Sequence, residues 1–204
     1  MNPLFLRTIL FTFSLKKQFQ VVLWTFIFVL SLPLIAVLVV TNTGIQAVSD
    51  QLVTVNVQSH NIEIHDPSGK VIATIQANTV WPVNGVVTLE FGESDLPYQP
   101  VHTGIDIADK IGDPVTTFMK GKVSYIGNLS WGYGKYIIID HGNNISSLYG
   151  HLSRVDVKEG QEVTPGDVIG LEGSTGWSTG PHVHFEIRIF GIPVNPRMFI
   201  GGNP

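Results

Sequence analysis

The longest hydrophobic run of this chain covers residues 19–40, where 22 residues pass without a charged side chain. The run has no polar face of the kind that an amphipathic surface helix shows. As a helix it would be about 33 Å long, enough to cross the hydrocarbon core of a bilayer. The pattern therefore predicts a transmembrane helix over residues 19–41, preceded by a short tail over residues 1–18.

The charges around this run predict its orientation. Arg7, Lys16 and Lys17 precede it, and no acidic residue occurs before Asp50. The positive-inside rule then places residues 1–18 in the cytoplasm and the rest of the chain outside. A cleaved signal peptide is the alternative, but its apolar region is typically about 7–15 residues long and ends at a small-x-small site. Because the run is longer and Gln46-Ala47 matches that site poorly, we favour an uncleaved signal anchor in the cell membrane.

Residues 42–79 combine a polar stretch with a hairpin pattern. Up to residue 60 the stretch is rich in Thr, Asn, Gln and Ser, around the short alternating segment Val53–Val57. The alternating runs Asn61–His65 and Lys70–Ile75 then flank the turn-forming Asp66-Pro-Ser-Gly. We expect a stalk that carries a β-hairpin.

Residues 80–204 alternate short β-branched runs with glycines. Gly85–Gly92, Tyr136–Asp140 and His184–Ile189 are examples of such runs. No segment of this region has the 3.6-residue period of an amphipathic helix. We therefore expect an all-β domain of antiparallel strands, sandwich-like in its packing.

Composition and charge narrow the classes of function. The chain has no cysteine, which excludes disulfides, thiolate zinc sites and thiol nucleophiles. All 16 acidic residues follow the apolar run, against nine Lys or Arg, so the part outside the membrane carries a net charge of −7. That charge argues against nucleic acid and anionic lipid as partners. The membrane contact that we expect is the anchor helix alone.

Metal-binding chemistry is indicated by two separate segments. His182 and His184 are one residue apart, so on a strand their side chains would face the same side. His102 and Asp106 lie about 13 Å apart in a fully extended segment, which is awkward for two ligands of one ion. Gly104 lies between them, where a bend is least costly. A catalytic zinc needs about three His, Asp or Glu ligands and one open position, so the four residues leave one histidine to spare.

An ordered series of motifs extends from Trp81 to the end of the chain. Besides the two segments above, the series contains Trp81-Pro-Val-Asn-Gly85, Phe91-Gly92, Gly112-Asp-Pro-Val115, Gly132-Tyr-Gly134, Ile139-Asp-His-Gly142, Tyr149-Gly-His-Leu152, Gly173-Ser-Thr-Gly176 and Pro193-Val-Asn-Pro196. Together they resemble the lysostaphin/LytM-type zinc endopeptidases, which cut peptide bridges in peptidoglycan. The resemblance identifies residues 80–204 as a LytM-type zinc metallopeptidase domain and does not cover residues 1–80.

The resemblance implies roles for five residues. His102, Asp106 and His184 correspond to the zinc ligands, and His151 and His182 to two catalytic histidines that do not bind the metal. Two neutral imidazoles and one carboxylate would leave Zn²⁺ with a net charge of +1, which suits the activation of water and of an amide carbonyl. Histidine also suits the proton transfers of peptide hydrolysis near neutral pH. Which of the two catalytic histidines is the base stays open.

Other residues near these motifs are expected to have structural roles. The turns around Gly132–Gly134 and Gly173–Gly180 would wall a substrate groove for the peptides of peptidoglycan. Tyr149 and Glu186 would pack or support a ligand. The remaining histidines, His60, His65 and His141, are interpreted as surface residues outside the site.

Two other functions were weighed against the hydrolase. Some members of this family are catalytically silent scaffolds or activators of another wall hydrolase, but these typically lack metal ligands or catalytic histidines that are present here. The segment Val157–Gly170 resembles the hairpin of lipoyl and biotinyl carriers, with Met119-Lys120 as a possible modified pair. A carrier would not need five converging metal-type residues, and a periplasmic adaptor would need a long helical hairpin. An active, membrane-anchored wall hydrolase is therefore favoured.

Overall fold

The computed structural model describes residues 17, 19–29, 31, 43–56, 61–76, 78–94 and 101–204 of the chain. The chain divides into two compact units, Met1–Thr41 and Asn42–Pro204. In the first unit, residues 19–29 form a helix with exposed apolar side chains.

The predicted transmembrane helix lies largely outside the described residues. Residues 30 and 32–41 of the predicted span, and most of the predicted tail, are among those that the structure does not describe. Within the described part of the chain, no helix combines the length and the apolarity that a membrane crossing requires. The anchor over residues 19–41 therefore remains a prediction.

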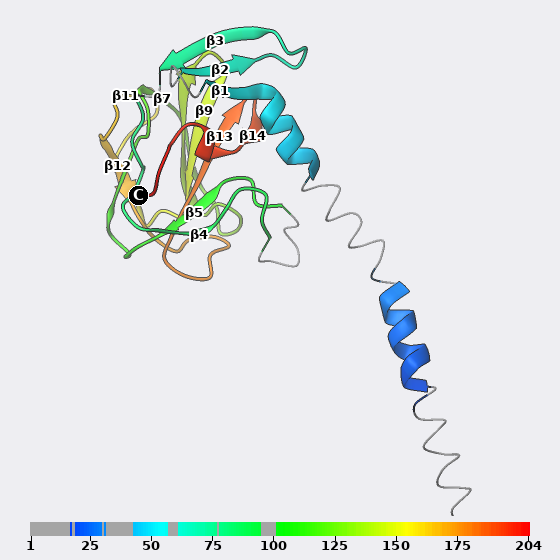
Figure 1. Ribbon diagram of the computed structural model, residues 1–204. Coiled ribbons are helices and arrows are strands. Elements are labelled where there is room, and N and C mark those ends of the chain that lie inside the picture. The colour runs from blue at the N-terminus through cyan, green and yellow to red at the C-terminus, as the bar shows by residue number, and fades with distance from the viewer. Residues whose placement is uncertain are drawn as a thin grey trace, which may run out of the picture. The chain divides into compact units, whose positions relative to one another are not determined.

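The second unit is built almost entirely from antiparallel strands, in agreement with the predicted all-β class (Figure 1). Its largest sheet follows the order β11-β7-β8-β9-β13-β5-β4, with β14 also paired to β13. These strands are β4 (Val86–Leu89), β5 (Ile105–Ala108), β7 (Gly121–Asn128), β8 (Lys135–Gly142), β9 (Ile145–Gly150), β11 (Glu162–Val163), β13 (Val183–Ile189) and β14 (Ile192–Val194).

Two smaller sheets complete the unit. One has the order β10-β12-β6, formed by β6 (Pro114–Thr116), β10 (Arg154–Val155) and β12 (Val168–Leu171). The other has the order β1-β2-β3, formed by β1 (Val53–Asn56), β2 (Asn61–His65) and β3 (Val71–Gln76). A 3₁₀ helix, η1 (Pro196–Met198), follows β14. The hairpin predicted between residues 61 and 75 is present as β2 and β3.

Residues 43–56 and 61–76, which were expected to form a stalk, belong to the same compact unit as the rest of the β domain. Residues 43–52 are helical, and this helix leads directly into β1 (Figure 1). Its residue Ser49 is buried and accepts a hydrogen bond from the backbone N–H of Asn195, at 2.9 Å. Ile62 and Ile64 of β2 are buried in the same hydrophobic core as β13. The polar composition of the stretch concealed this packing, because a serine occupies the buried stripe of the helix.

Strand β13 separates the core from the candidate site, because its side chains alternate between two faces. Phe185 and its neighbours at every second position point into the core, where the Phe185 ring lies 5.3 Å from that of Tyr149 and 5.4 Å from that of Phe118. His184 and Glu186 point to the opposite face, yet both are buried. A strand that is buried on both faces and carries polar residues on one of them is suited to hold a functional group in a fixed position.

Candidate active site

The pairing of two strands places His184 beside Asp106. In the antiparallel pair formed by β13 and β5, these two residues lie directly opposite each other. Residues opposite each other across a ladder point to the same face and have neighbouring Cβ atoms. Here Nδ1 of His184 lies 2.8 Å from Oδ1 of Asp106.

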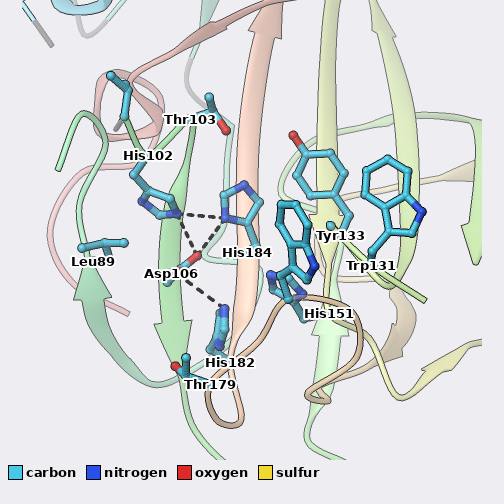
Figure 2. A pocket seen from close by; sticks show the side chains of 13 residues that line it. Leu89, His102, Thr103, Asp106, Trp131, Tyr133, His151, Thr179, His182 and His184 are labelled. Atoms are coloured by element: carbon cyan, nitrogen blue, oxygen red, sulfur yellow. Dashed lines mark hydrogen bonds and ion pairs between the residues drawn. The ribbon is translucent and has the colours of Figure 1, made fainter. Parts of the chain in front are cut away.

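His102 reaches the same point through a bend before β5. Its Nε2 lies 3.0 Å from Oδ1 of Asp106 and 2.9 Å from Nδ1 of His184. The predicted bend is present at Thr103 and Gly104. A Cβ atom on Gly104 would lie 2.3 Å from the carbonyl oxygen of Phe185, so only glycine permits this approach to β13. Figure 2 shows His102, Asp106 and His184 converging from the segment before β5, from β5 and from β13.

These three residues fit a divalent metal. Nδ1 of His102 lies 3.1 Å from the carbonyl oxygen of Glu90, and Nε2 of His184 lies 3.0 Å from Oε1 of Glu186. Both partners can accept, so each outer nitrogen carries a proton and the inner nitrogens are available as ligands. The ligand atoms of His102, Asp106 and His184 all lie within 4.8 Å of one another, and no other group of this kind occurs among the described residues.

The protonation of this cluster is linked to metal binding. Burial alone would raise the pKa of Asp106, but hydrogen bonds from His102 and His184 outweigh it and hold that pKa well below its usual range. Burial would likewise lower the pKa of His184, but its bonds to Asp106 and Glu186 raise that pKa to about 9. A divalent ion would take the place of the proton on Nδ1 of His184, so protons compete with the metal here.

Glu186 holds His184 from the outside. Besides His184, its Oε1 accepts hydrogen bonds from Oγ1 of Thr103 at 2.5 Å and from the hydroxyl of Tyr133 at 2.8 Å. Its Oε2 accepts a bond from Nε of Arg188 at 2.6 Å. Burial would raise the pKa of Glu186, but the hydrogen bond and charge of His184, with Arg188, lower it to about 2. Glu186 is therefore an ionised, fully bonded group that sets the ring orientation of His184.

The two predicted catalytic histidines lie on the open side of the cluster. Nδ1 of His151 lies 2.7 Å from the carbonyl oxygen of Thr175, and Nδ1 of His182 lies 2.9 Å from that of Gly180. Since a carbonyl only accepts, both Nδ1 atoms carry the proton, and both Nε2 atoms are free to take one. Nε2 of His182 lies 3.6 Å from Oδ2 of Asp106, and the rings of His151 and His182 are 4.6 Å apart.

His151 is held as a neutral base. Burial, together with the repulsion between its protonated form and a protonated His182, lowers its pKa to about 4. Its backbone has φ of 61°, a left-handed conformation that non-glycine residues adopt rarely. The neighbouring chain enforces it, since the backbone N–H of His151 donates to the carbonyl of Tyr133 at 2.8 Å. Such local strain is frequent at functional sites.

A cavity of about 360 Å³ contains the five predicted site residues. The loop between β7 and β8 and the loop before β13, both predicted to wall a groove, contribute further lining. The other residues that line the cavity are Leu89, Val101, Thr103, Trp131, Gly132, Tyr133, Trp177 and Thr179. Figure 2 shows Tyr133 between His184 and Trp131 in this cavity.

Several residues near the site were missed or misjudged from the sequence. Thr103, Tyr133 and Arg188 hold Glu186, and the alternation of His184, Glu186 and Arg188 along one strand was the available signal. Tyr149 packs in the core. His141, predicted to be a surface residue outside the site, is half-buried and does not line the cavity. Its Nδ1 lies 2.8 Å from the carbonyl oxygen of Lys120, its Nε2 lies 2.8 Å from Oγ of Ser147, and burial lowers its pKa to about 4.

The other two histidines were also predicted to lie outside the site. His65 belongs to the β2–β3 hairpin, where its Nε2 lies 2.9 Å from Oγ1 of Thr54. It does not line the cavity. His60 lies outside the described residues.

Comparison with known proteins adds three relationships to this geometry. The model of peptidase family M23 matches residues 100–196. The DD-carboxypeptidase/endopeptidase Mpg of Neisseria meningitidis serogroup B is 49% identical over 96 residues, which are 47% of this chain and 22% of that protein. The murein hydrolase activator NlpD of Salmonella typhimurium is 36% identical over 151 residues, which are 73% of this chain and 39% of that protein. This chain thus spans well under half the length of either curated relative.

One solved structure matches more than half of this chain. The catalytic domain of the prophage-encoded M23 protein EnpA from Enterococcus faecalis, crystallised as a mutant, is 39% identical with a TM-score of 0.52. The match covers 57% of this chain and 92% of that one. The similarity is therefore to a whole catalytic domain and not to an isolated motif.

Proposed function

The chain belongs to peptidase family M23, and from this membership and the geometry of its site we propose that it is a zinc-dependent endopeptidase that hydrolyses peptide cross-bridges of peptidoglycan. The observation that carries the proposal is the convergence of five residues in one cavity. His102, Asp106 and His184 are within reach of one ion, while His151 and His182 present unprotonated Nε2 atoms beside them.

The donor set supports zinc as the metal. Two imidazoles and one carboxylate, with the remaining side open to a cavity, form the usual ligand set of a catalytic zinc site. His102 would bind through Nε2, Asp106 through Oδ1 and His184 through Nδ1. When bound, the ion would supply Lewis acidity toward water and toward the scissile carbonyl.

The two remaining histidines would move the protons. Peptide hydrolysis requires that the attacking water lose a proton and that the leaving amine gain one. In their neutral forms His151 and His182 carry the proton on Nδ1 and leave Nε2 free on the same side of the cluster, so one would accept the proton from water. The other, once protonated, would stabilise the developing negative charge on the carbonyl oxygen or donate to the amine. The carbonyls of Thr175 and Gly180 keep both rings oriented for this exchange.

Digestion of purified peptidoglycan tests the proposal directly. The zinc-loaded full chain is incubated with peptidoglycans that differ in bridge chemistry, and the products are identified by mass. Release of products with a newly freed amine and carboxyl at a cross-bridge supports the proposal. The matched control is the His184→Ala chain, which should release none. Cleavage only in the glycan strand, or equal cleavage by the control, would exclude a zinc endopeptidase.

An activator of another hydrolase is the alternative that one observation favours. The relative named as a murein hydrolase activator matches a longer part of this chain than the endopeptidase does. The presence of all five site residues favours the enzyme, since a pure activator needs neither ligands nor bases. If the chain alone leaves every peptidoglycan intact but accelerates a purified amidase, and His184→Ala does the same, the activator function replaces the enzyme.

We also propose a location at the cell membrane, with the β domain outside the cytoplasm. The uncharged run over residues 19–40 and the cations at Arg7, Lys16 and Lys17 support it. The proposed substrate supports it independently, because peptidoglycan lies outside the cytoplasmic membrane.

A further inference from the structure

Two tryptophans that the proposed chemistry does not use stand at the cavity of the site. Trp131 and Trp177 line the same cavity as His184, and their side chains are 57% and 54% exposed. Their ring centroids are 6.0 Å apart, and the ring planes are inclined by 52°. Two large indoles that are more than half exposed beside one another form an apolar surface of the kind that marks a binding site.

The loops that carry these indoles are fixed to each other. The backbone N–H of Trp177 donates to the carbonyl of Gly132 at 2.8 Å. Gly176, whose φ is 72°, packs so closely that a Cβ atom there would lie 2.3 Å from that same carbonyl oxygen. The backbone N–H of Lys135 donates to Oγ1 of Thr175 at 2.9 Å. These backbone contacts therefore hold the two indoles in fixed positions relative to each other.

The same two loops also hold His151. The carbonyl of Tyr133 accepts the backbone N–H of His151 at 2.8 Å, and the carbonyl of Thr175 lies 2.7 Å from its Nδ1. Each loop thus carries one indole and one contact to the proposed catalytic histidine. A substrate group held by the indoles would consequently have a fixed position relative to the reacting centre.

We propose that Trp131 and Trp177 form a subsite that binds the ammonium group of a diamino acid side chain in the substrate, next to the scissile bond. The proposal rests on the proposed peptidoglycan endopeptidase function and names the chemistry that the same site recognises. Tryptophan is the best aromatic partner for a cation, which is attracted when it lies within about 6 Å of the ring centroid. With centroids 6.0 Å apart, one ammonium can satisfy that distance for both rings.

The charges around the site favour a cationic group. None of the described residues that line the cavity is Lys or Arg, so no side chain of the lining repels an ammonium held at the indoles. The chain beyond the apolar run carries a net charge of −7, which attracts cations over a long range. Two rings inclined by 52° present no single flat surface, which suits a rounded ammonium and its methylenes better than the flat face of a sugar.

The chemistry of a cross-bridge supplies such an ammonium. Joining two peptides through an amide requires a residue with a second amine on one of them. A residue of this kind whose side-chain amine is not itself cross-linked carries an ammonium at neutral pH. A cut next to this residue would place its ammonium within reach of the cavity.

The test compares two synthetic cross-linked peptides that differ only in whether this side-chain amine is free or acetylated. With the zinc-loaded full chain at neutral pH, kcat/KM should be about fivefold to tenfold higher for the free amine. In the Trp131→Ala, Trp177→Ala double variant that ratio should fall to about one. Tyr125→Ala, an exposed aromatic that does not line the cavity, should keep the full ratio.

A second measurement separates the subsite from the activity. Tryptophan fluorescence is titrated with Nα-acetyl-lysine amide and with its Nε-acetylated form; only the first should change the emission of the native chain, and neither that of the double variant. Equal kcat/KM for both peptides in the native chain overturns the subsite and leaves the endopeptidase intact. Failure to cleave either peptide, with the fluorescence difference preserved, overturns the endopeptidase only. If the tryptophan variants lose activity only on substrate that carries glycan, the subsite binds a sugar and the proposed ammonium binding is wrong.

Discussion

Histidine shows how neighbours decide the chemistry of one residue type in this chain. His184 is held by a carboxylate on its outer nitrogen, which turns the inner nitrogen into a ligand. His151 is held by a backbone carbonyl on Nδ1 and exposes Nε2 to the cavity, which makes it a base. His141 is half-buried beside the ring of Phe118 and bonded at both nitrogens, which makes it structural. The sequence motifs separate these roles only through the family resemblance, because each role depends on contacts between distant segments.

The first prediction concerns the metal ligands. The purified chain should bind about one zinc ion, and His184→Ala should lose it, because two of three protein ligands are too few for tight binding. Metal content is measured by elemental analysis after dialysis. His65→Ala, a histidine of the β2–β3 hairpin, is the matched control and should retain its zinc. A fully active preparation that contains no divalent metal would contradict the assignment.

The second prediction separates bases from ligands. His151→Asn and His182→Ala should each lower turnover by about 100-fold or more and leave the zinc content nearly unchanged. Asparagine is chosen at residue 151 because it tolerates the left-handed backbone there. His102→Ala should remove zinc and activity together. A His151→Asn chain that hydrolyses peptidoglycan at the native rate would show that this residue is not catalytic.

The third prediction concerns Glu186 as a positioning residue. Glu186→Gln should weaken zinc binding about tenfold, because the neutral amide no longer stabilises the ring of His184. Affinity is measured by competition with a chelating dye, with circular dichroism as the check on folding. Glu162→Gln, an exposed carboxylate on β11, is the control. Unchanged affinity in a folded Glu186→Gln chain would limit Glu186 to packing.

At the scale of elements, the hydrophobic pattern of the chain predicted where strands occur better than it predicted which strands pair with each other. The glycine-separated runs predicted an antiparallel all-β domain and the 61–75 hairpin, because alternation reports the local backbone directly. They did not predict that β5 and β13 lie side by side, since these strands are 75 residues apart and register is a property of the folded sheet. The bend at Gly104 was predictable because the ligand spacing itself demanded it.

The role of residues 42–79 could not be predicted by the same means. The buried stripe of the helix at residues 43–52 contains Ser49, which conceals its period, and the polar composition then suggested a stalk. What the stretch packs against is the segment around Asn195, almost 150 residues later. Local composition carries no information on such a contact.

The fourth prediction tests this packing. Ile64→Ala in β2 should destabilise the whole β domain by about 2–5 kcal/mol, because Ile64 is completely buried in the common core. Guanidinium unfolding is followed by tryptophan fluorescence, which reports on residues 81, 131 and 177 of the domain. Ile72→Ala, at a position that is 39% exposed on β3, should cost about 1 kcal/mol or less. An unchanged transition in Ile64→Ala would mean that the hairpin unfolds independently.

At the scale of the whole molecule, the chain couples an apolar N-terminal run to an acidic β domain. The run contains no charged residue, whereas all 16 acidic residues of the sequence lie in the part of the chain that follows it. The proposed membrane anchor would account for this division: it would keep the proposed hydrolase near the inner surface of the wall and restrict which cross-bridges it reaches. The choice of substrate would then depend on the distance of a cross-bridge from the membrane as well as on its chemistry.

The last prediction is the topology that this division implies. Protease added to intact, wall-stripped cells should remove the β domain, because by the positive-inside rule the cations at Arg7, Lys16 and Lys17 would retain the N-terminus inside. A tag at each end, detected by immunoblot, distinguishes the two sides. Replacing the three cations by glutamine should lower the fraction of correctly oriented chains, whereas Lys120→Gln, far beyond the run, should not. A β domain that resists the protease would mean that it lies in the cytoplasm. A mature N-terminus near Ala47 would mean that the apolar run is a cleaved signal peptide.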